Sequence, residues 1–443
     1  MSVHEANRQR LISLDQFRGY TILGMLLVNF LGDYAVCPRW LRHTNDYCSY
    51  ADTIMPQFLF AAGFALRLSL VRRWQREGVI PWLRFLRRIA GLALVAVVWY
   101  SLSDADGLWQ RLSSRPVVEV LLEQCKRQWF QTLMHIAATS LWLLPVMMGS
   151  ARVRLCWALI SGVLHVVLSG WFNFAWVHAS PRGIDGGPLG FLTWVIPAVL
   201  GTLAYDELSI SGASRGARRI FLAGLLVMLA GWVLSFPTVL YDVSGDSGLL
   251  ASVGDYAADP VWPRAERWRL WDGRLPEPPL VPPPGPAERK LNYWMMSQRA
   301  GSVSYTTFAG GLSLVLFAGF VWVCDVRGRS AGVPGTLGAN SLAAYLLHDV
   351  AARLVAPWLQ RDSGLVPVLT GWLIFAGLVY GCCRLLQWKR WYLRVGAELA
   401  GGSGVGSEGV CGRAGSFHSI YGIRPDSISL RATGGMSSQS SLT

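Results

Sequence analysis

The sequence has little charge for its length, and this scarcity excludes an ordinary soluble domain. Only 15% of the 443 residues are charged, whereas 52% are apolar, and the apolar residues form long runs with few ionisable side chains. Runs of this kind are typical of polytopic membrane proteins. The net charge of +13 does not predict nucleic-acid binding, because the arginines form short clusters between the apolar runs, a pattern typical of membrane topology.

Paired cysteines are also missing. None of the eight cysteines belongs to a C-x-x-C pair or to a Cys/His cluster, so we expect no metal site. Cys37 and Cys48 share the loop after the first apolar run, and they could form a disulfide if that loop is extracytoplasmic. The first apolar run lacks a small-residue cleavage site, and we expect it to act as an uncleaved signal anchor.

The apolar runs predict an all-α integral membrane protein with about ten transmembrane helices, because each run approaches the roughly 20 residues that a helix needs to cross a bilayer. The predicted spans are residues 17–35, 52–71, 86–103, 131–149, 153–177, 188–205, 217–240, 302–324, 337–357 and 364–385. We expect a cytoplasmic segment over residues 1–16, a transmembrane domain over 17–390, and a Gly/Ser-rich, disordered cytoplasmic tail over 391–443.

Positively charged loops predict the orientation of these spans, because cytoplasmic loops collect arginine and lysine. Clusters such as those in residues 72–88, 215–219 and 327–329 all fall on one side of the predicted membrane. Both termini are therefore predicted to be cytoplasmic, and the loop that carries His43 faces the other side. The long segment 242–301 is then extracytoplasmic.

Two segments outside the spans have a distinctive composition. Residues 104–130 contain an amphipathic stretch that could lie along the membrane interface. Trp262, Trp268 and Trp271 of the long extracytoplasmic segment fit either interface anchoring or stacking on sugar rings. Whether residues 242–301 form a lid stays open.

The first span carries a polar stripe. At 100° per residue, Asp15, Arg18 and Asn29 fall within about 60° of one another on an otherwise apolar helix, and Arg18 and Asn29 are about 16 Å apart along its axis. The stripe could line a site that begins at the cytoplasmic interface. Alternatively, Asp15 and Arg18 form an interfacial ion pair, and Asn29 makes a hydrogen bond between packed helices.

The loop between the first two spans carries a candidate catalytic base, His43. Most loop histidines are only solvated, but a histidine with a pKa near about 6.5 can take a proton from an attacking amine or hydroxyl. Asp52 could orient this histidine or cap the second span, and the sequence favours capping.

Another polar stripe lies on the predicted span 337–357. Ser341, Tyr345 and His348 share one helical face, and Asn340 borders it. Ionisable residues inside a span tend to face the bundle interior or a wet cavity, so His348 is either part of a functional site or a hydrogen-bonded structural histidine. For His135 and His165, which lack polar neighbours on their own helices, we favour a structural role.

Several blocks of the sequence resemble the membrane-bound heparan-α-glucosaminide N-acetyltransferase family and its bacterial relatives. They occur in the family's order over roughly residues 10–350. The blocks are RLISLDQFRG at 10–19, Val28-Asn29, His43, ADTIMPQFLF at 51–60, GPLGFLTWVIPAVLGTLA at 187–204 and DVRGRSAGVPGTLGANSLAAYLLHD at 325–349.

The resemblance implies a membrane-bound acetyltransferase that uses cytoplasmic acetyl-CoA to acetylate an amino sugar or glycan on the extracytoplasmic side of the bilayer. His43 matches the family's catalytic histidine, and Asn29 matches its active-site asparagine. Whether His43 acts as a general base or as a transient acyl carrier stays open. The residues that we expect to bind acetyl-CoA are Asp15, Arg18, Asn340, Ser341, Tyr345 and His348.

The acceptor is not determined by these motifs. Asn45, Asp46 and Tyr47 stand where the family has Trp-Asn-Gly, so the acceptor and the acyl chain length stay open. A transporter of an envelope sugar or lipid precursor, or an O-acyltransferase of envelope polysaccharide, would use the same polar stripes. The large luminal domain of the animal enzymes is absent, which favours a cell-envelope protein of the bacterial inner membrane. The oligomeric state is open, a homodimer included.

Overall fold

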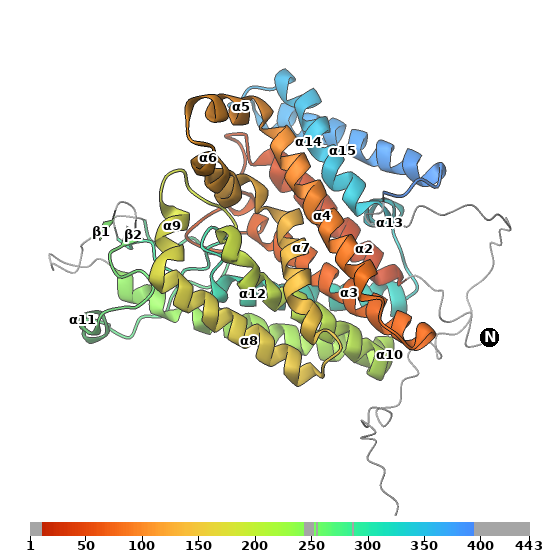
Figure 1. Cartoon of the computed structure of the whole chain (residues 1–443), viewed down its shortest axis with the longest axis horizontal. Coiled ribbons are helices and arrows are strands. Elements are labelled where there is room, and N and C mark those ends of the chain that lie inside the picture. Colours follow the sequence, from red (N-terminus) through yellow and green to blue (C-terminus); the bar gives the residue numbers. More distant parts are fainter. Residues whose placement is uncertain (1–10, 243–251, 254–255, 286–287, 394–443) are drawn as a thin grey trace, which may run out of the picture.

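The computed structural model describes residues 11–242, 252–253, 256–285 and 288–393, which are mostly helical (Figure 1). Most of the predicted segment 1–16 and of the predicted tail 391–443 lies outside these residues. The helices are α2 (Ile12–Leu31), α3 (Ile54–Glu77), α4 (Trp82–Ser103), α5 (Ala105–Ser114), α6 (Val117–Glu123), α7 (Thr132–Leu143), α8 (Ala151–Leu168), α9 (Phe174–His178), α10 (Phe191–Leu234), α11 (Ala265–Arg269), α12 (Val303–Phe320), α13 (Gly332–Ala339), α14 (Ser341–Val355) and α15 (Leu365–Trp388).

Shorter elements connect these helices. In the described residues the strands are β1 (Ser252–Val253) and β2 (Tyr256–Ala257), which pair antiparallel. The short 3₁₀ or π turns are η1 (Arg39–Leu41), η2 (Ala51–Thr53), η3 (Gln124–Trp129), η4 (Leu144–Val146), η5 (Ser169–Asn173), η6 (Gly187–Gly190), η7 (Phe236–Tyr241), η9 (Val321–Val326) and η10 (Ala356–Trp358).

Six helical stretches among the described residues are long and apolar enough to cross a membrane. They are Ala51–Glu77, Trp82–Ser103, Ala151–His178, Gly187–Tyr241, Val303–Val326 and Leu365–Trp388. The chain is therefore an all-α protein of the integral membrane class, as its apolar runs predicted. The number of ten spans and the cytoplasmic placement of the termini stay predictions.

The stretch Gly187–Tyr241 contains two of the predicted spans. They meet at Gly212, whose φ of 74° and ψ of 173° break helix α10. Arg219 Nη1 donates to Glu207 Oε1 at 3.1 Å, although twelve residues of straight helix would separate the two residues by about 18 Å. The chain therefore folds back at Gly212, where the positive φ suits glycine.

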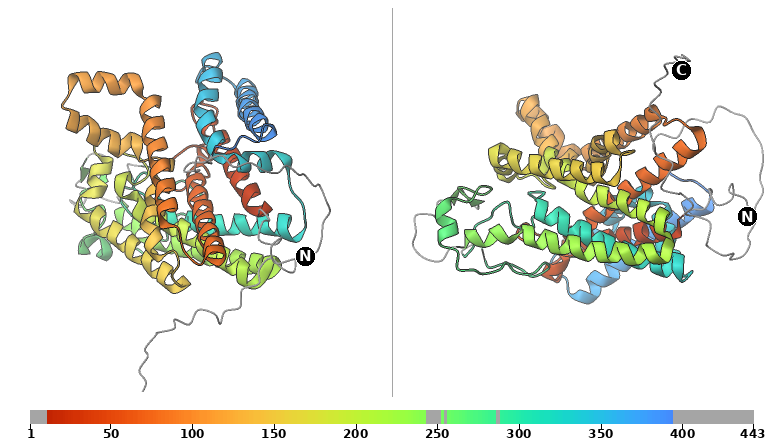
Figure 2. Two further views of the ribbon diagram at one scale, coloured as in Figure 1. Left: turned by 45° about the vertical axis from the view of Figure 1, so that its right-hand side comes forward. Right: turned by 90° about the horizontal axis from the view of Figure 1, so that it is seen from below.

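Helices α3 and α10 approach each other at two glycines. A Cβ on Gly63 would lie 2.0 Å from the Ala198 carbonyl oxygen, and one on Gly201 would lie 2.1 Å from that of Phe60. Small residues allow such close packing of membrane helices. Helix α10 contacts both α3 and α12, and α10 and α12 run side by side in Figure 2.

We expect Gly63→Ala to lower the thermal unfolding temperature, because the added methyl group forces α3 away from α10. Overpacking of this kind costs about 1–3 kcal/mol. Gly377→Ala is the matched control, since nothing lies within 4 Å of a Cβ at that position in α15. It should leave the unfolding temperature unchanged or raise it, because alanine stabilises a helix interior by about 0.5–1 kcal/mol relative to glycine. Tryptophan fluorescence during heating in detergent measures the unfolding temperature of both variants. If Gly63→Ala and Gly377→Ala changed it equally, the close packing of α3 and α10 would not be the cause.

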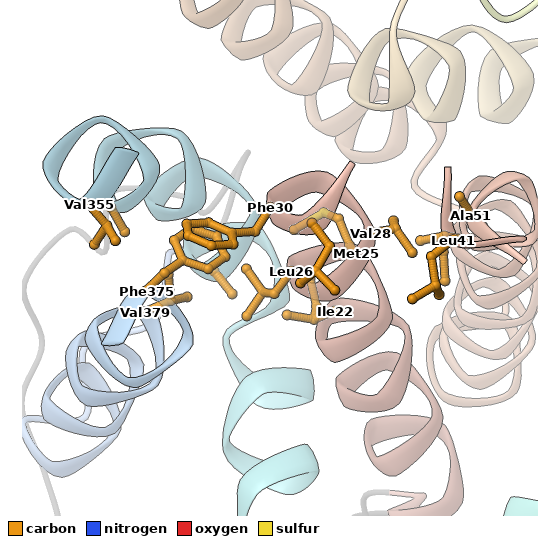
Figure 3. Close-up of a cluster of buried hydrophobic side chains, with 14 of the residues drawn as sticks. Ile22, Met25, Leu26, Val28, Phe30, Leu41, Ala51, Val355, Phe375 and Val379 are labelled. Atoms are coloured by element: carbon orange, nitrogen blue, oxygen red, sulfur yellow. The ribbon is translucent and has the colours of Figure 1, made fainter. Parts of the chain in front are cut away.

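A cluster of apolar side chains fixes α14 and α15 against α2 (Figure 3). The rings of Phe30 on α2 and Phe375 on α15 stack with centroids 4.9 Å apart, and Val355 of α14 packs in the same cluster. Interiors packed in this way resist displacement. The polar faces of α2 and α14 are therefore held at a fixed distance.

Candidate active site

A cavity of about 690 Å³ lies where the C-terminal parts of α2 and α14 meet the loop that carries His43. Its wall combines polar and ionisable side chains from helices with others from three loop regions. The polar residues that line it are Asn29, His43, Thr44, Asn45, Tyr100, Ser103, Gln128, Gln131, Thr132, Asp185, Gln298, Arg299, Tyr345, His348, Asp349 and Arg353.

The two polar stripes predicted from separate helices face each other. At one end an Arg18 Nη2 group on α2 donates to the hydroxyl of Ser341 on α14. At the other end Asn29 Nδ2 lies 3.4 Å from His348 Nε2. Arg18 precedes Asn29 on α2, and their partners Ser341 and His348 follow the same order on α14. The two helices therefore run in the same direction.

His348 has partners that suit either protonation state. Its Nδ1 lies at hydrogen-bond distance from the Tyr345 carbonyl oxygen, which can only accept. With the proton on Nδ1, Nε2 accepts from Asn29. Asp349 Oδ1 lies 3.2 Å from the same Nε2 and can accept from a protonated ring. Both ring nitrogens of His348 therefore have hydrogen-bond partners.

His43 is paired with a buried carboxylate. Its Nδ1 lies 3.0 Å from Asp52 Oδ1, and the Asp52 side chain is fully buried. Since the carboxylate accepts, Nδ1 carries the ring proton and Nε2 of the neutral imidazole is left as the basic nitrogen. The His43 side chain is 51% exposed because it faces the cavity.

The hydrogen bonds of Asp52 decide between its two predicted roles. The carboxylate accepts from the backbone and hydroxyl of Ser49 at 3.0 and 2.9 Å, and from the Thr44 hydroxyl at 3.0 Å. No side chain caps η2 or α3. The capping role that the sequence favoured is therefore wrong; Asp52 holds the loop around His43 together and orients the ring.

Two residues that sequence reasoning did not select complete the surroundings of His43. Gln298 Oε1 lies 3.1 Å from His43 Nδ1, and Gln298 Nε2 donates to Asp185 Oδ1 at 2.7 Å. Asp185, Gly186 and Gly187 have φ values of 53°, 81° and 61°, so the loop turns sharply there. In the sequence, the motif Asp-Gly-Gly predicts a turn and gives no sign of a functional site.

Burial and charge shift the pKa values of this group in linked ways. Burial raises the pKa of Asp185 to about 6, although its hydrogen bond from Gln298 and the nearby His43 oppose the shift. For His43, burial alone would lower the pKa, but the hydrogen bond to Asp52 and the negative charges of Asp52 and Asp185 outweigh it. The pKa of His43 is therefore raised above its usual 6.5.

The remaining predicted site residues lie outside the cavity wall. Asp15 forms an ion pair with Arg18 at 3.9 Å. An ion pair was one of the two alternatives that the sequence left open for these residues. Asn340 is buried, and its Nδ2 donates at 3.0 Å to the Thr336 carbonyl. His135 and His165 are fully buried and do not line the cavity, and neither do the three tryptophans Trp262, Trp268 and Trp271.

The predicted disulfide in the His43 loop is not formed. Cys37 and Cys48 are both buried free thiols, and each sulfur contacts the carbonyl oxygen of the next residue at 3.6 Å. Packing and the Asp52 hydrogen bonds hold the loop instead.

The residues suit an acetyl-CoA donor at two separate places. Asn29, Tyr345 and His348 bring amide, hydroxyl and imidazole groups to the cavity, where an acetyl group could be held. Arg18, whose side chain is 34% exposed, offers a guanidinium that suits a phosphate at the other end of α2. The two places are about 16 Å apart along the helix, a length that an extended pantetheine arm can span.

Comparison with known families gives a match over the N-terminal part of the chain. Residues 10–181 match the family described as heparan-alpha-glucosaminide N-acetyltransferase, catalytic. The match confirms the family resemblance, and it includes Asn29, His43 and Asp52, whereas Asp185, Gln298 and the whole of α14 lie beyond it. No curated protein matches the chain.

Proposed function

We propose that this chain, which over residues 10–181 belongs to the heparan-alpha-glucosaminide N-acetyltransferase catalytic family, is a membrane acetyltransferase. It moves an acetyl group from cytoplasmic acetyl-CoA to the amino group of a sugar or glycan on the extracytoplasmic side, at the inner membrane of a bacterium. The observation that carries the proposal is the His43–Asp52 pair at the wall of the cavity that Asn29 and His348 also line.

His43 acts as the general base in this proposal. Asp52 keeps the proton on Nδ1, so the free Nε2 removes a proton from the acceptor amine as its nitrogen bonds to the acetyl carbon. The carbon–sulfur bond breaks, and its electron pair leaves with the sulfur of the thiolate. The amide of Asn29 donates to the acetyl oxygen, on which negative charge develops.

The donor would be held by the stripe that α2 and α14 share. Arg18 would bind a phosphate, with Asp15 and Ser341 fixing its side chain. Tyr345 and His348 would line the place of the thioester. Asn340 would act indirectly, through the α13–α14 junction at which it is buried.

Donor binding tests the proposal before any acceptor is known. A ligand that binds only the folded state stabilises it by about 2.7 kcal/mol at one hundred times its Kd. We therefore expect acetyl-CoA to raise the unfolding temperature of the detergent-purified protein, and ATP to have no effect. Arg18→Ala should reduce the shift, and Arg215→Ala, a change in the turn between the two halves of α10, should not. The absence of any shift in folded protein would favour a transporter.

The pH dependence of transfer should depend on the charged side chains next to His43, because they raise its pKa. A base must be neutral to act, so transfer should fall as the pH drops below the raised pKa of His43. Asp185→Asn removes a negative charge that raises this pKa, and the acidic midpoint of the kcat/KM profile should therefore move to lower pH. Asp33→Asn, at a loop carboxylate outside the cavity wall, is the control. An unchanged midpoint in Asp185→Asn would contradict the role of His43 as the titrating base.

A further inference from the structure

Helices α4 and α14 border the cavity and also carry apolar stripes that face away from it. On α4, Leu94, Val98 and Leu102 are exposed at intervals of four residues, which places them on one face. On α14, Val350 and Leu354 are exposed at the same interval. In a membrane protein, exposed apolar stripes of this kind are in contact with lipid. The cavity is therefore separated from the bilayer by these two helices.

The seam between α4 and α14 is bridged by polar groups where it borders the cavity. Three hydrogen bonds cross it: Trp99 Nε1 to Asp349 Oδ2 at 2.8 Å, Tyr100 hydroxyl to Tyr345 hydroxyl at 2.9 Å, and Arg353 Nη2 to the Ser103 carbonyl at 3.0 Å. All of these residues except Trp99 line the cavity. Trp99, Tyr100 and Tyr345 also pack in an apolar cluster with Leu342 and Leu346. Opening the seam therefore breaks the three hydrogen bonds and separates these side chains.

The position of Asp349 indicates that water reaches this seam. Its side chain is 36% exposed, yet the next residue, Val350, belongs to the lipid-facing stripe. Charged side chains next to lipid are costly, and where they occur they usually line a wet path for a substrate. Asp349 and Arg353 therefore mark a polar path that begins beside the bilayer.

Helices α5 and α6 add an apolar surface beyond the end of α4, from which they extend as a hairpin (Figure 2). Trp109 of α5 and Val118 and Leu122 of α6 are exposed. Short helices with exposed apolar side chains lie in the interface between headgroups and acyl chains. The seam thus lies at the depth where a lipid carries its headgroup.

From these features we propose that the acceptor is an amino sugar linked to a lipid. Its apolar chain stays in the bilayer, its polar linker passes between α4 and α14 beside Asp349 and Arg353, and the sugar amine reaches His43. This inference rests on the proposed acetyltransferase function and names the class of acceptor. A soluble sugar would need no route through the seam.

Cross-linking the seam separates the two classes of acceptor. Leu102→Cys and Leu354→Cys flank the Arg353–Ser103 hydrogen bond on lipid-facing positions, and a short bis-methanethiosulfonate reagent can join them. Transfer from acetyl-CoA is then measured in nanodiscs to a dialkylglycerol glucosaminide and to methyl glucosaminide. We expect cross-linking to lower transfer to the lipid-linked sugar about tenfold or more, as blocked gating steps do, and to leave transfer to the methyl glycoside unchanged. Reduction of the cross-link should restore transfer to the lipid-linked sugar.

The wild-type protein treated with the same reagent controls for its own cysteines. Equal transfer to both acceptors after cross-linking, or equal loss of both, would overturn the route through the seam. As a measurement that needs no variant, a diazirine analogue of the lipid-linked sugar should label α4 and α14 in the unmodified protein; labelling spread over all lipid-facing helices would also overturn it. If the untreated protein acetylates neither acceptor and acetyl-CoA gives no thermal shift, the proposed function itself fails, and this inference with it.

Discussion

His43→Ala is expected to lower acetyl transfer by about 10²–10⁴-fold, the range in which a general base contributes to catalysis. The imidazole is half exposed in the cavity, so its removal should leave the unfolding temperature and the acetyl-CoA-induced shift intact. A steady-state assay with radiolabelled acetyl-CoA and an amino-sugar acceptor measures the loss.

The matched control for His43 is His178→Ala. His178 ends α9, hydrogen-bonds the Phe174 carbonyl at 2.8 Å through Nδ1, and does not line the cavity. We expect this variant to keep its transfer rate. Full activity in His43→Ala would contradict the proposed mechanism, whether the histidine acts as a base or as an acyl carrier. Retention of radiolabel on denatured wild-type protein, absent from His43→Ala, would favour the carrier.

Asp52→Asn should have the second largest effect, a fall in kcat on the order of 10²–10³-fold. In serine proteases the same change behind the catalytic histidine costs about 10⁴-fold, because the wrong tautomer is stabilised. Here the new amide would donate to His43 Nδ1 and move the ring proton to Nε2, where it blocks the base. The loss should be smaller than in the proteases because Gln298 Oε1, 3.1 Å from Nδ1, still accepts from it.

Asp46→Asn controls for a general effect of charge in the same loop. Asp46 is a loop carboxylate that does not line the cavity, and its pKa is raised chiefly by burial. We expect near-normal transfer in this variant. Because the Asp52 carboxylate also accepts from Ser49 and Thr44, Asp52→Asn should lower the unfolding temperature, so rates are compared below the transition. If Asp52→Asn and Asp46→Asn lower kcat equally, the orienting role of Asp52 is wrong.

The helical periodicity of the sequence was enough to define the two polar faces of the site. Asp15, Arg18 and Asn29 on α2, and Tyr345 and His348 on α14, could be grouped because the helix repeat depends only on local backbone geometry. The sequence did not determine that Arg18 contacts Ser341 or that Asn29 contacts His348. The residues of each pair are more than 300 positions apart, and their contact depends on how the helices pack.

The sequence also did not determine which residues surround His43. Its loop was selected from the sequence, but Asp52 was assigned to capping, because a carboxylate at the start of a span is compatible with either role. The fold decided between them by burying Asp52 and turning it toward the imidazole. Asp185 and Gln298 come from two other loops, and neither belongs to a pattern that a sequence alone can read.

The sequence by itself determined that this is an all-α membrane protein whose residues 10–181 resemble an acetyltransferase family, because apolar length, charge distribution and short motifs are properties of the chain. Only the tertiary structure decided which polar groups share the cavity, which of them lie outside it, and that hydrogen bonds between α4 and α14 cross beside it. These arrangements result from long-range packing of helices and loops, in which each contact depends on all the others.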